Sequence, residues 1–208
     1  MKINNLVLLL FAVALSVTTY QLVALKKKST ETDINKEEIV LSAIHNRKSV
    51  RKYTNQSVKK EDLVKIIKAG MAAPSGHDTR PWQFIVITDR SIMMQLREKL
   101  EWARGLDGSP AAIVVCGDLN KVDERNPDFW ITDTSAATQN ILLAIEALEL
   151  GGVWSTIYPG KDRMDHTRKV LNLPDHIMPL CVIPLGYPTG VEKPKDKYDS
   201  TLIHWEKW

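Results

Sequence analysis

The sequence predicts a mixed β-sheet wrapped by helices, with one hydrophobic helix at its centre. Two or three helical patterns precede the first strand pattern, so the chain lacks the regular alternation of a doubly wound sheet. Residues 111–116 form a continuous apolar run, which is typical of a strand buried on both faces. Residues 134–150 are apolar around nearly the whole helix, and such a helix belongs in the interior of a domain.

The first elements of the domain are two helices. Asn35 and Glu38 have the spacing of a capping box, and the apolar residues after them predict a helix that ends near His45. Ser57 is the expected cap of a second helix, which has acidic residues in its first turns and stops before Pro74.

Strands and helices then follow one another. Residues 82–88 are aromatic and β-branched and predict a strand. Asp89 is the expected start of a third helix. The buried strand 111–116 comes next, and Asp133 is expected to precede the long helix 134–150.

The C-terminal part completes the sheet and ends in a polar tail. We expect a strand at 153–158, a helix at 161–171 and a last apolar strand at 179–185. The tail beyond carries Trp205 and Trp208, which would expose a large apolar area unless they dock on the domain or on a second subunit.

The composition is that of a folded globular protein. The 208 residues are 44% hydrophobic and 25% charged, with a formal net charge of +3. These values exclude disordered, collagen-like and coiled-coil chains and give no reason to expect a nucleic-acid partner. Cys116 and Cys181 each lie in an apolar run, so we expect two buried thiols rather than a disulfide. The histidines share no metal-ligand spacing, and no metal site is expected.

The N-terminal segment differs in character from the rest. Residues 6–25 carry no charge, and as a helix they would be about 30 Å long, the thickness of a bilayer core. We therefore expect a hydrophobic membrane anchor or signal segment at 1–28, a polar linker at 29–36 and the folded domain at 37–208.

The side of the membrane follows from the flanking charges. Three lysines at 26–28 follow the apolar segment and only Lys2 precedes it, which places the domain in the cytoplasm by the positive-inside rule. Two alternatives stay open: a signal anchor with the domain outside, and a cleaved signal peptide with residues 6–15 as its apolar centre, which would export the domain.

No familiar catalytic motif is present. The sequence lacks a dinucleotide-binding glycine motif, a Walker loop, a zinc-protease helix and a nucleophile elbow. An enzyme built on this chain would therefore take its chemistry from a cofactor.

Two segments have the residue types of a ligand site. Residues 47–52 place four cations and a hydroxyl together, which suits a phosphate, although a solvated basic turn is the plainer alternative. Residues 72–82 combine two prolines with serine, glycine and aspartate, which favours a loop that holds a flat, hydrogen-bonding ligand.

Five motifs taken together resemble the FMN-dependent nitroreductase family over residues 39–208. They are Arg-Lys-Ser-Val-Arg at 47–51, Ala-Pro-Ser-Gly at 73–76 running into Arg80-Pro81-Trp82, Ala-Ala-Thr-Gln-Asn at 136–140, Leu-Gly-Tyr-Pro at 185–188, and the tail with Lys193-Pro194-Lys195 and His204-Trp205. The resemblance implies an α+β nitroreductase-like fold and an intertwined homodimer with FMN at the subunit interface. It also implies that the C-terminal tail wraps around the partner subunit.

The resemblance also implies which residues bind the cofactor. Two basic groups would hold the phosphate and the ribityl chain: Arg47, Lys48, Ser49 and Arg51 early in the domain, and Lys195 and Lys197 late in it. The residues expected along the flavin are Pro74, Ser75, Gly76, Asp78, Gln139, Asn140, Gly152, Val153 and Trp154.

Some positions depart from the family pattern. Asp78 and Arg80 stand where the family often has amides, and an ionised carboxylate only accepts hydrogen bonds. Asp78 must therefore accept from the ligand or pair with Arg80. Trp154 replaces a small residue and either stacks near the flavin ring or fills the core.

The implied reaction moves electrons from NADH or NADPH through FMN to an electron-poor small molecule such as a nitroaromatic or a quinone. No catalytic side chain is expected, because the flavin carries the bond chemistry. Arg51 is the expected cation for the reduced flavin. Two alternatives stay open: reductive dehalogenation on the same fold, and a flavin-binding module without productive turnover.

Overall fold

The computed structural model describes residues 13–21 and 35–208. Residues 13–21 are helical, and no helix within the described ranges is both long enough and apolar enough to cross a bilayer. Most of the expected hydrophobic segment at 6–25 lies outside the described residues, so the anchor stays a prediction.

The chain divides into a unit of residues 1–42 and a compact unit of residues 43–208. Helix α2, Lys36–Asn46, begins in the first unit and ends in the second. Its start agrees with the expected cap, because the Asn35 Oδ1 accepts a 3.4 Å hydrogen bond from the Glu38 N–H.

An antiparallel sheet forms the centre of the compact unit. Its strands run in the order β1-β2-β5-β3, and β4 also pairs with β5. They are β1 (Trp82–Ile87), β2 (Ala111–Asp118), β3 (Gly151–Gly152), β4 (Ser155–Thr156) and β5 (Ile177–Gly186). The expected mixed sheet is wrong for these strands, since every pair of them is antiparallel. After each connecting segment the chain enters the sheet antiparallel to the strand beside it, so among these strands no crossover places two parallel strands side by side.

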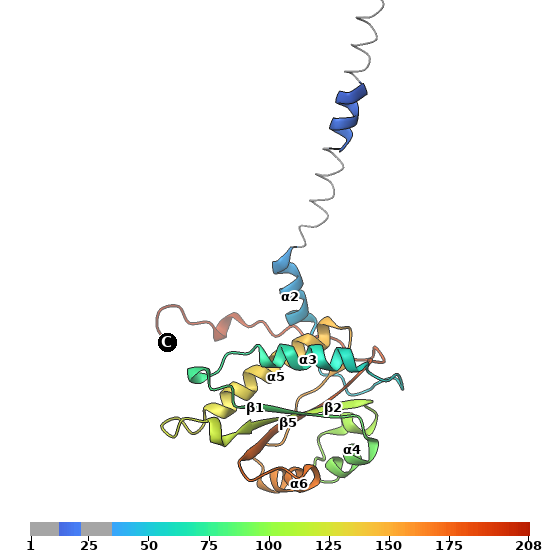
Figure 1. The fold of residues 1–208 in the computed structure, drawn as a ribbon. Helices are drawn as coiled ribbons and strands as arrows, with labels where there is room; N and C mark the ends of the chain where they lie inside the picture. Colours follow the sequence, from blue (N-terminus) through green and yellow to red (C-terminus); the bar gives the residue numbers. More distant parts are fainter. Residues whose placement is uncertain (1–12, 22–34) are drawn as a thin grey trace, which may run out of the picture. The chain divides into compact units, whose positions relative to one another are not determined.

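Helices cover both faces of the sheet (Figure 1). Helices α3 (Lys60–Met71) and α5 (Phe129–Ala147) lie on one face, and α4 (Arg90–Arg97) and α6 (Lys161–Leu171) lie on the other. Alternate side chains of β2 point to opposite faces of the sheet. Ile113 and Val115 pack in the core with α3 and α5, and Val114 and Cys116 pack in the core with α4 and α6. Every residue of β2 is therefore buried, as the apolar run predicts.

Helix α5 is the central hydrophobic helix that the sequence predicts. It has 19 residues and packs along α3, where Gly70 allows close approach. A Cβ at Gly70 would lie only 2.9 Å from the Ile141 Cγ1. Because Ile141 is fully buried, its side chain contributes roughly 1.5–3 kcal/mol to folding.

Three expected boundaries are corrected by the structure. Helix α5 begins at Phe129, so Asp133 is a buried residue inside the helix rather than its cap. The cap of α3 is Lys59 and not Ser57, and no side chain bonds there. Of the expected strand 153–158 only Ser155–Thr156 (β4) is a strand, and β3 precedes it at Gly151–Gly152, because this region makes only brief pairings with β5.

Other expectations are confirmed. Asp89 caps α4, with its Oδ1 accepting hydrogen bonds from the backbone N–H groups of Ser91 and Ile92. Helix α6 has the expected bounds. Cys116 and Cys181 are both buried and free.

Candidate functional site

Basic side chains from both ends of the compact unit meet at one cavity of about 370 Å³. One group follows α2 and the other lies in the C-terminal tail, about 140 residues later. The lining residues are Arg47, Lys48, Ser49, Arg51, Glu192, Lys193, Lys195 and Lys197. The two predicted basic groups are therefore brought together by the fold.

The early basic segment is fixed to the edge of the sheet. The Val50 N–H donates a 3.0 Å hydrogen bond to the Gly152 carbonyl, next to a β-bridge between Ser49 and Gly152. The Tyr53 hydroxyl lies 2.6 Å from the Val50 carbonyl oxygen and 2.9 Å from that of Pro184. Burial of this hydroxyl raises the pKa of Tyr53 well above its usual value. Tyr53 thus stays a neutral donor.

Two carboxylates organise this cavity. Glu146, in the last turns of α5, pairs with the Lys48 ammonium at 3.1 Å. The Glu192 Oε1 accepts hydrogen bonds from the backbone N–H groups of Arg51 at 2.8 Å and Lys52 at 3.2 Å. In the described part of the chain, no carboxylate forms an ion pair with the remaining basic residues of the lining: Arg47, Arg51, Lys193, Lys195 and Lys197.

A second cavity, of about 520 Å³, shares Arg51 with the first. It is lined by Arg51, Trp102, Arg104, Val153, Trp154, Ser155, Thr156 and Arg163. The expected residues Val153 and Trp154 are therefore beside the basic cavity. Trp154 is half-buried and does two things: it packs against the core and it lines the cavity.

A third cavity of about 590 Å³ shares Arg47, Lys195 and Lys197 with the basic one. Gln139 on α5 contributes to its wall. The neighbouring Asn140 points to α3 instead, where its Nδ2 donates a 3.1 Å hydrogen bond to the Ala69 carbonyl. Of this expected pair, only Gln139 lines a cavity described above.

The proline loop lies in another part of the compact unit. The Gly76 N–H donates a 3.0 Å hydrogen bond to the buried Asp133 carboxylate, near the start of α5. Glu146 marks the basic cavity and is 13 positions further along the same helix. At 1.5 Å per residue the separation along α5 is about 20 Å. Within a single chain the fold therefore does not bring Pro74, Ser75, Gly76 and Asp78 to the basic cavity.

The loop is held in an unusual conformation. The Asp78 carboxylate accepts two hydrogen bonds from the Arg80 guanidinium, at 2.7 and 2.6 Å. This contact lowers the pKa of Asp78. His77, Asp78 and Arg80 have backbone φ values of 52°, 55° and 48°, which residues other than glycine rarely adopt. Of the two expected roles for Asp78, the pairing with Arg80 is the one seen in the protomer.

Several lining residues were not predicted from the sequence, among them Trp102, Arg104, Arg163 and Glu192. Trp102 and Arg104 lie just before and at the start of the short helix η2 (Arg104–Asp107), Arg163 lies in α6, and Glu192 lies in the C-terminal tail. No local pattern could have found them, because only the tertiary fold places them at the cavities.

Known proteins support the fold. The model of the "Nitroreductase family" matches residues 44–103 and 93–187 of this chain. The chain belongs to the nitroreductase family. A protein of Methanothermobacter thermautotrophicus named "Putative NADH dehydrogenase/NAD(P)H nitroreductase" is 43% identical over 81% of this chain and 87% of its own length.

Solved structures of nitroreductases are similar in fold to this chain. A protein of Parabacteroides distasonis with the same name has a TM-score of 0.77 at 52% identity, covering 81% of this chain and 98% of that one. An "FMN-dependent Nitroreductase" of Clostridium difficile has a TM-score of 0.74 at 29% identity, covering 81% and 99%. The expected α+β nitroreductase fold and the oxidoreductase class are confirmed at this level.

Proposed function

We propose that this nitroreductase binds FMN and passes electrons from NADH or NADPH to an electron-poor small molecule such as a nitroaromatic or a quinone. The observation that carries the proposal is the pair of cavities joined at Arg51, one basic and one lined by tryptophan. The FMN in the name of the Clostridium difficile relative supports the same cofactor.

The basic cavity fits the phosphate of FMN. A phosphate dianion needs several charged donors when it is removed from bulk water. Arg47, Arg51, Lys195 and Lys197 supply such donors, and the Ser49 hydroxyl adds a neutral one. The single charge of Glu192, whose Oε1 accepts hydrogen bonds from two backbone N–H groups, offsets only part of the positive charge of these four side chains.

The tryptophan-lined cavity suits the ring end of the cofactor. Bound FMN supplies the hydride chemistry, and the protein supplies position and charge. Val153 and Trp154 form an apolar wall, and Ser155 and Thr156 add hydroxyls. Arg51 belongs to both cavities, so its cation can stabilise negative charge on the bound redox group.

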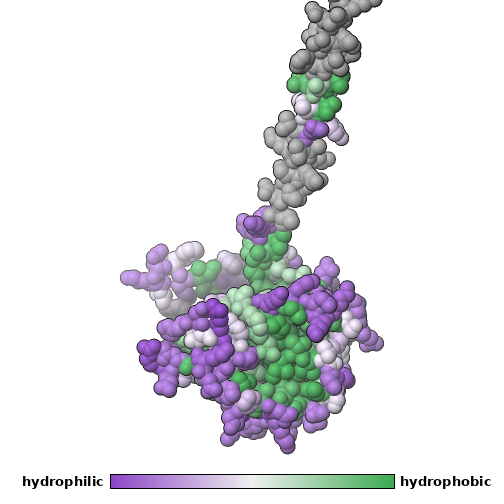
Figure 2. Space-filling model, viewed as in Figure 1, coloured by the Kyte–Doolittle hydropathy of each residue, from purple (hydrophilic) through white to green (hydrophobic). Residues whose placement is uncertain are grey.

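A homodimer with FMN at the subunit interface accounts for the distant proline loop. Two α5 helices packed antiparallel would bring the loop at the start of one helix to the basic cavity at the end of the other. The side of α5 that is not buried supplies a seam of small and apolar residues, including Ala136, Leu143 and Ala147. Figure 2 shows apolar residues gathered in the middle of one face of the compact unit.

Two exposed tryptophans in the C-terminal tail support docking on a second subunit. Trp205 and Trp208 are 81% and 100% exposed, so the compact unit does not cover them. Such exposed aromatic area is costly in water and favours docking on a second subunit.

Cofactor binding is tested by removing the shared cations. The double substitution Arg47→Ala and Arg51→Ala should remove the absorption band near ~450 nm from the purified full-length protein. Lys169→Gln, an exposed change on α6, is the charge-matched control for each substitution and should keep the band. A double variant that retains stoichiometric FMN would contradict the role of these arginines. Bound FMN without NAD(P)H oxidation would favour a flavin-binding module instead.

The dimer is tested by Leu143→Glu on α5. This variant should run as a monomer in sedimentation and lose FMN together with the dimer, because the site needs both chains. Leu119→Glu, at an exposed apolar residue outside α5, is the control. A dimeric Leu143→Glu protein would show that α5 is not the seam.

For the N-terminal segment we propose a membrane anchor at 6–25 with the domain on the cytoplasmic side. The uncharged run and the lysines at 26–28 support it. Membrane fractionation and protease protection in intact cells test the two parts separately, and a shortened, released protein would favour signal cleavage.

A further inference from the structure

The tryptophan-lined cavity carries more positive charge than a flavin ring requires. Its wall holds three arginines, Arg51, Arg104 and Arg163, and no carboxylate. Within the described ranges, none of the three forms an ion pair with an acidic side chain. Unpaired guanidinium groups around one cavity favour an anionic ligand, and Arg51 alone is shared with the phosphate end.

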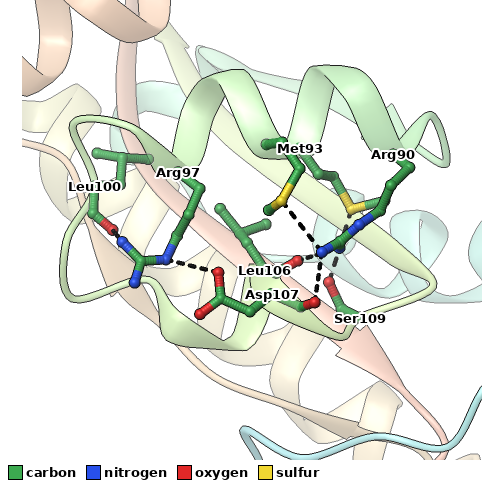
Figure 3. A network of polar contacts seen from close by, with 8 residues as sticks. Arg90, Met93, Arg97, Leu100, Leu106, Asp107 and Ser109 are labelled. Carbon is green, nitrogen blue, oxygen red and sulfur yellow. Dashed lines mark hydrogen bonds and ion pairs between the residues drawn. The ribbon is translucent and has the colours of Figure 1, made fainter.

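A polar network holds the backbone segment that carries Arg104. Arg104 opens the short helix η2, Arg104–Asp107, which two arginines of α4 fix in place (Figure 3). The Arg97 Nε donates a 2.9 Å hydrogen bond to the Asp107 carboxylate, and the Arg90 guanidinium donates to the backbone carbonyls of Leu106 and Asp107. Because Leu106 is also fully buried, the backbone that presents Arg104 is anchored on two sides.

Arg163 lies in the first turn of α6, where a cation is unusual. Helix N-termini favour negative charge, and no side chain caps the free N–H groups of this one. The Arg163 side chain lies against Gly160, since a Cβ there would be 2.3 Å from its Nε. Asp162, in the same turn, does not line the cavity. The N-terminus of α6 and the Arg163 guanidinium would therefore both attract an anion.

Trp102 adds an aromatic surface to the same wall. It is 77% exposed although it lies only two residues before the anchored helix η2. A large exposed aromatic beside arginines is suited to a flat ring that carries charge.

We propose that the redox partner entering this cavity is an aromatic ring with a negatively charged group, and that Arg104 and Arg163 bind that group while Trp102 contacts the ring. The electron transfer rests on the proposed function, whereas the binding does not. For a nitro group, the hydride equivalent from NAD(P)H and one proton give the nitroso group and water, and the anionic substituent is unchanged. A nitrobenzoate would offer its carboxylate as the anionic group, and a nicotinamide dinucleotide would offer a phosphate.

The acceptor arm compares 4-nitrobenzoate with neutral 4-nitrobenzamide, using the full-length protein with NADH. The measured quantity is the ratio of their kcat/KM values, so differences in ring reactivity cancel between variants. Arg104→Gln and Arg163→Gln should each lower this ratio about tenfold, since each removes a charge-assisted contact. Lys169→Gln removes one exposed charge from α6 and should not change the ratio. High salt should reduce the preference of the wild-type protein.

The donor arm compares NADPH with NADH at a fixed concentration of 4-nitrobenzamide. A change confined to this ratio in the two arginine variants would assign the charged group to the donor. Unchanged ratios in both arms would overturn the inference.

Calorimetry separates this inference from the proposed function. Titration with 4-nitrobenzoate measures binding without turnover, and both arginine variants should weaken it about tenfold relative to Lys169→Gln. Protein without FMN or reductase activity would refute the proposed function and leave this measurement valid. Equal heats for wild type and both variants would refute the anion site.

Discussion

The Lys48 ammonium lies 3.1 and 3.2 Å from the two carboxylate oxygens of Glu146, which joins the basic segment to the end of α5. Both side chains are mostly buried, so the pair is better shielded from water and salt than an ordinary surface ion pair. The charge of Lys48 is therefore already balanced within the protomer, whereas no described carboxylate forms an ion pair with Arg47.

This difference predicts unequal effects on cofactor affinity. Arg47→Gln should raise the Kd for FMN tenfold or more, because it removes a charge-assisted contact worth about 1.5–3 kcal/mol. Lys48→Met should raise it by about threefold at most and lower the free energy of unfolding by about 1 kcal/mol. Fluorescence titration of the apoprotein and urea unfolding measure the two quantities. Equal losses of FMN affinity would mean that Lys48 leaves Glu146 to bind the phosphate.

Glu192 gives a matched pair of variants. Glu192→Gln keeps an acceptor for the Arg51 and Lys52 N–H groups and removes a negative charge from the phosphate cavity. We expect FMN to bind about threefold more tightly at low ionic strength. Glu192→Ala also removes the acceptor, so it should lower the free energy of unfolding by about 1 kcal/mol. Weaker binding in both variants would indicate that the carboxylate itself contacts the ligand.

Gly76 should tolerate no side chain while Phe129 is present. A Cβ at Gly76 would lie 2.4 Å from the Phe129 Cδ2, which forces the loop or the start of α5 to move. Gly76→Ala should lower the free energy of unfolding by about 1–3 kcal/mol. In a Phe129→Ala background the same change should cost less than about 0.5 kcal/mol. Additive costs in this double-mutant cycle would locate the strain elsewhere.

The buried thiols predict a loss of stability at high pH. Burial raises the pKa of Cys116 and Cys181 to about 12 each, from a usual value near 9. Because the pKa of each thiol is higher in the folded protein, the unfolded chain loses its thiol protons first as the pH rises. The contribution of the thiols to the free energy of unfolding is therefore fully present below about pH 9 and is lost as the pH rises toward 12. The slope is at most about 1.4 kcal/mol per pH unit for each thiol.

Urea unfolding between pH 7.5 and 10.5 measures that slope. Cys116→Val keeps the site apolar and should remove about half of the thiol contribution to it. Neither thiol should react with a disulfide reagent at pH 8 while the protein is folded. Rapid labelling of the folded protein would show that the thiols are more accessible than the structure indicates.

Much of the fold was predictable because its signals are local. The alternation of faces in β2, the cap at Asp89 and the bounds of α6 depend on residues within one or two turns of each other. The start of α5 was not predictable in this way. Asp133 has the residue type of a cap, but its carboxylate instead holds the Gly76 N–H from a loop 57 residues earlier.

The site divides in the same manner. From the sequence by itself we predict that the basic segments near 47–51 and 195–197 act together on a phosphate, because the cations of the first segment are concentrated in a few residues and the family motifs connect it with the second. Only the tertiary structure decided that Lys48 is paired, that the proline loop lies about 20 Å away along α5, and that Arg104 and Arg163 face one cavity. The physical reason is that charge balance and distance depend on residues that the fold brings together from remote parts of the chain.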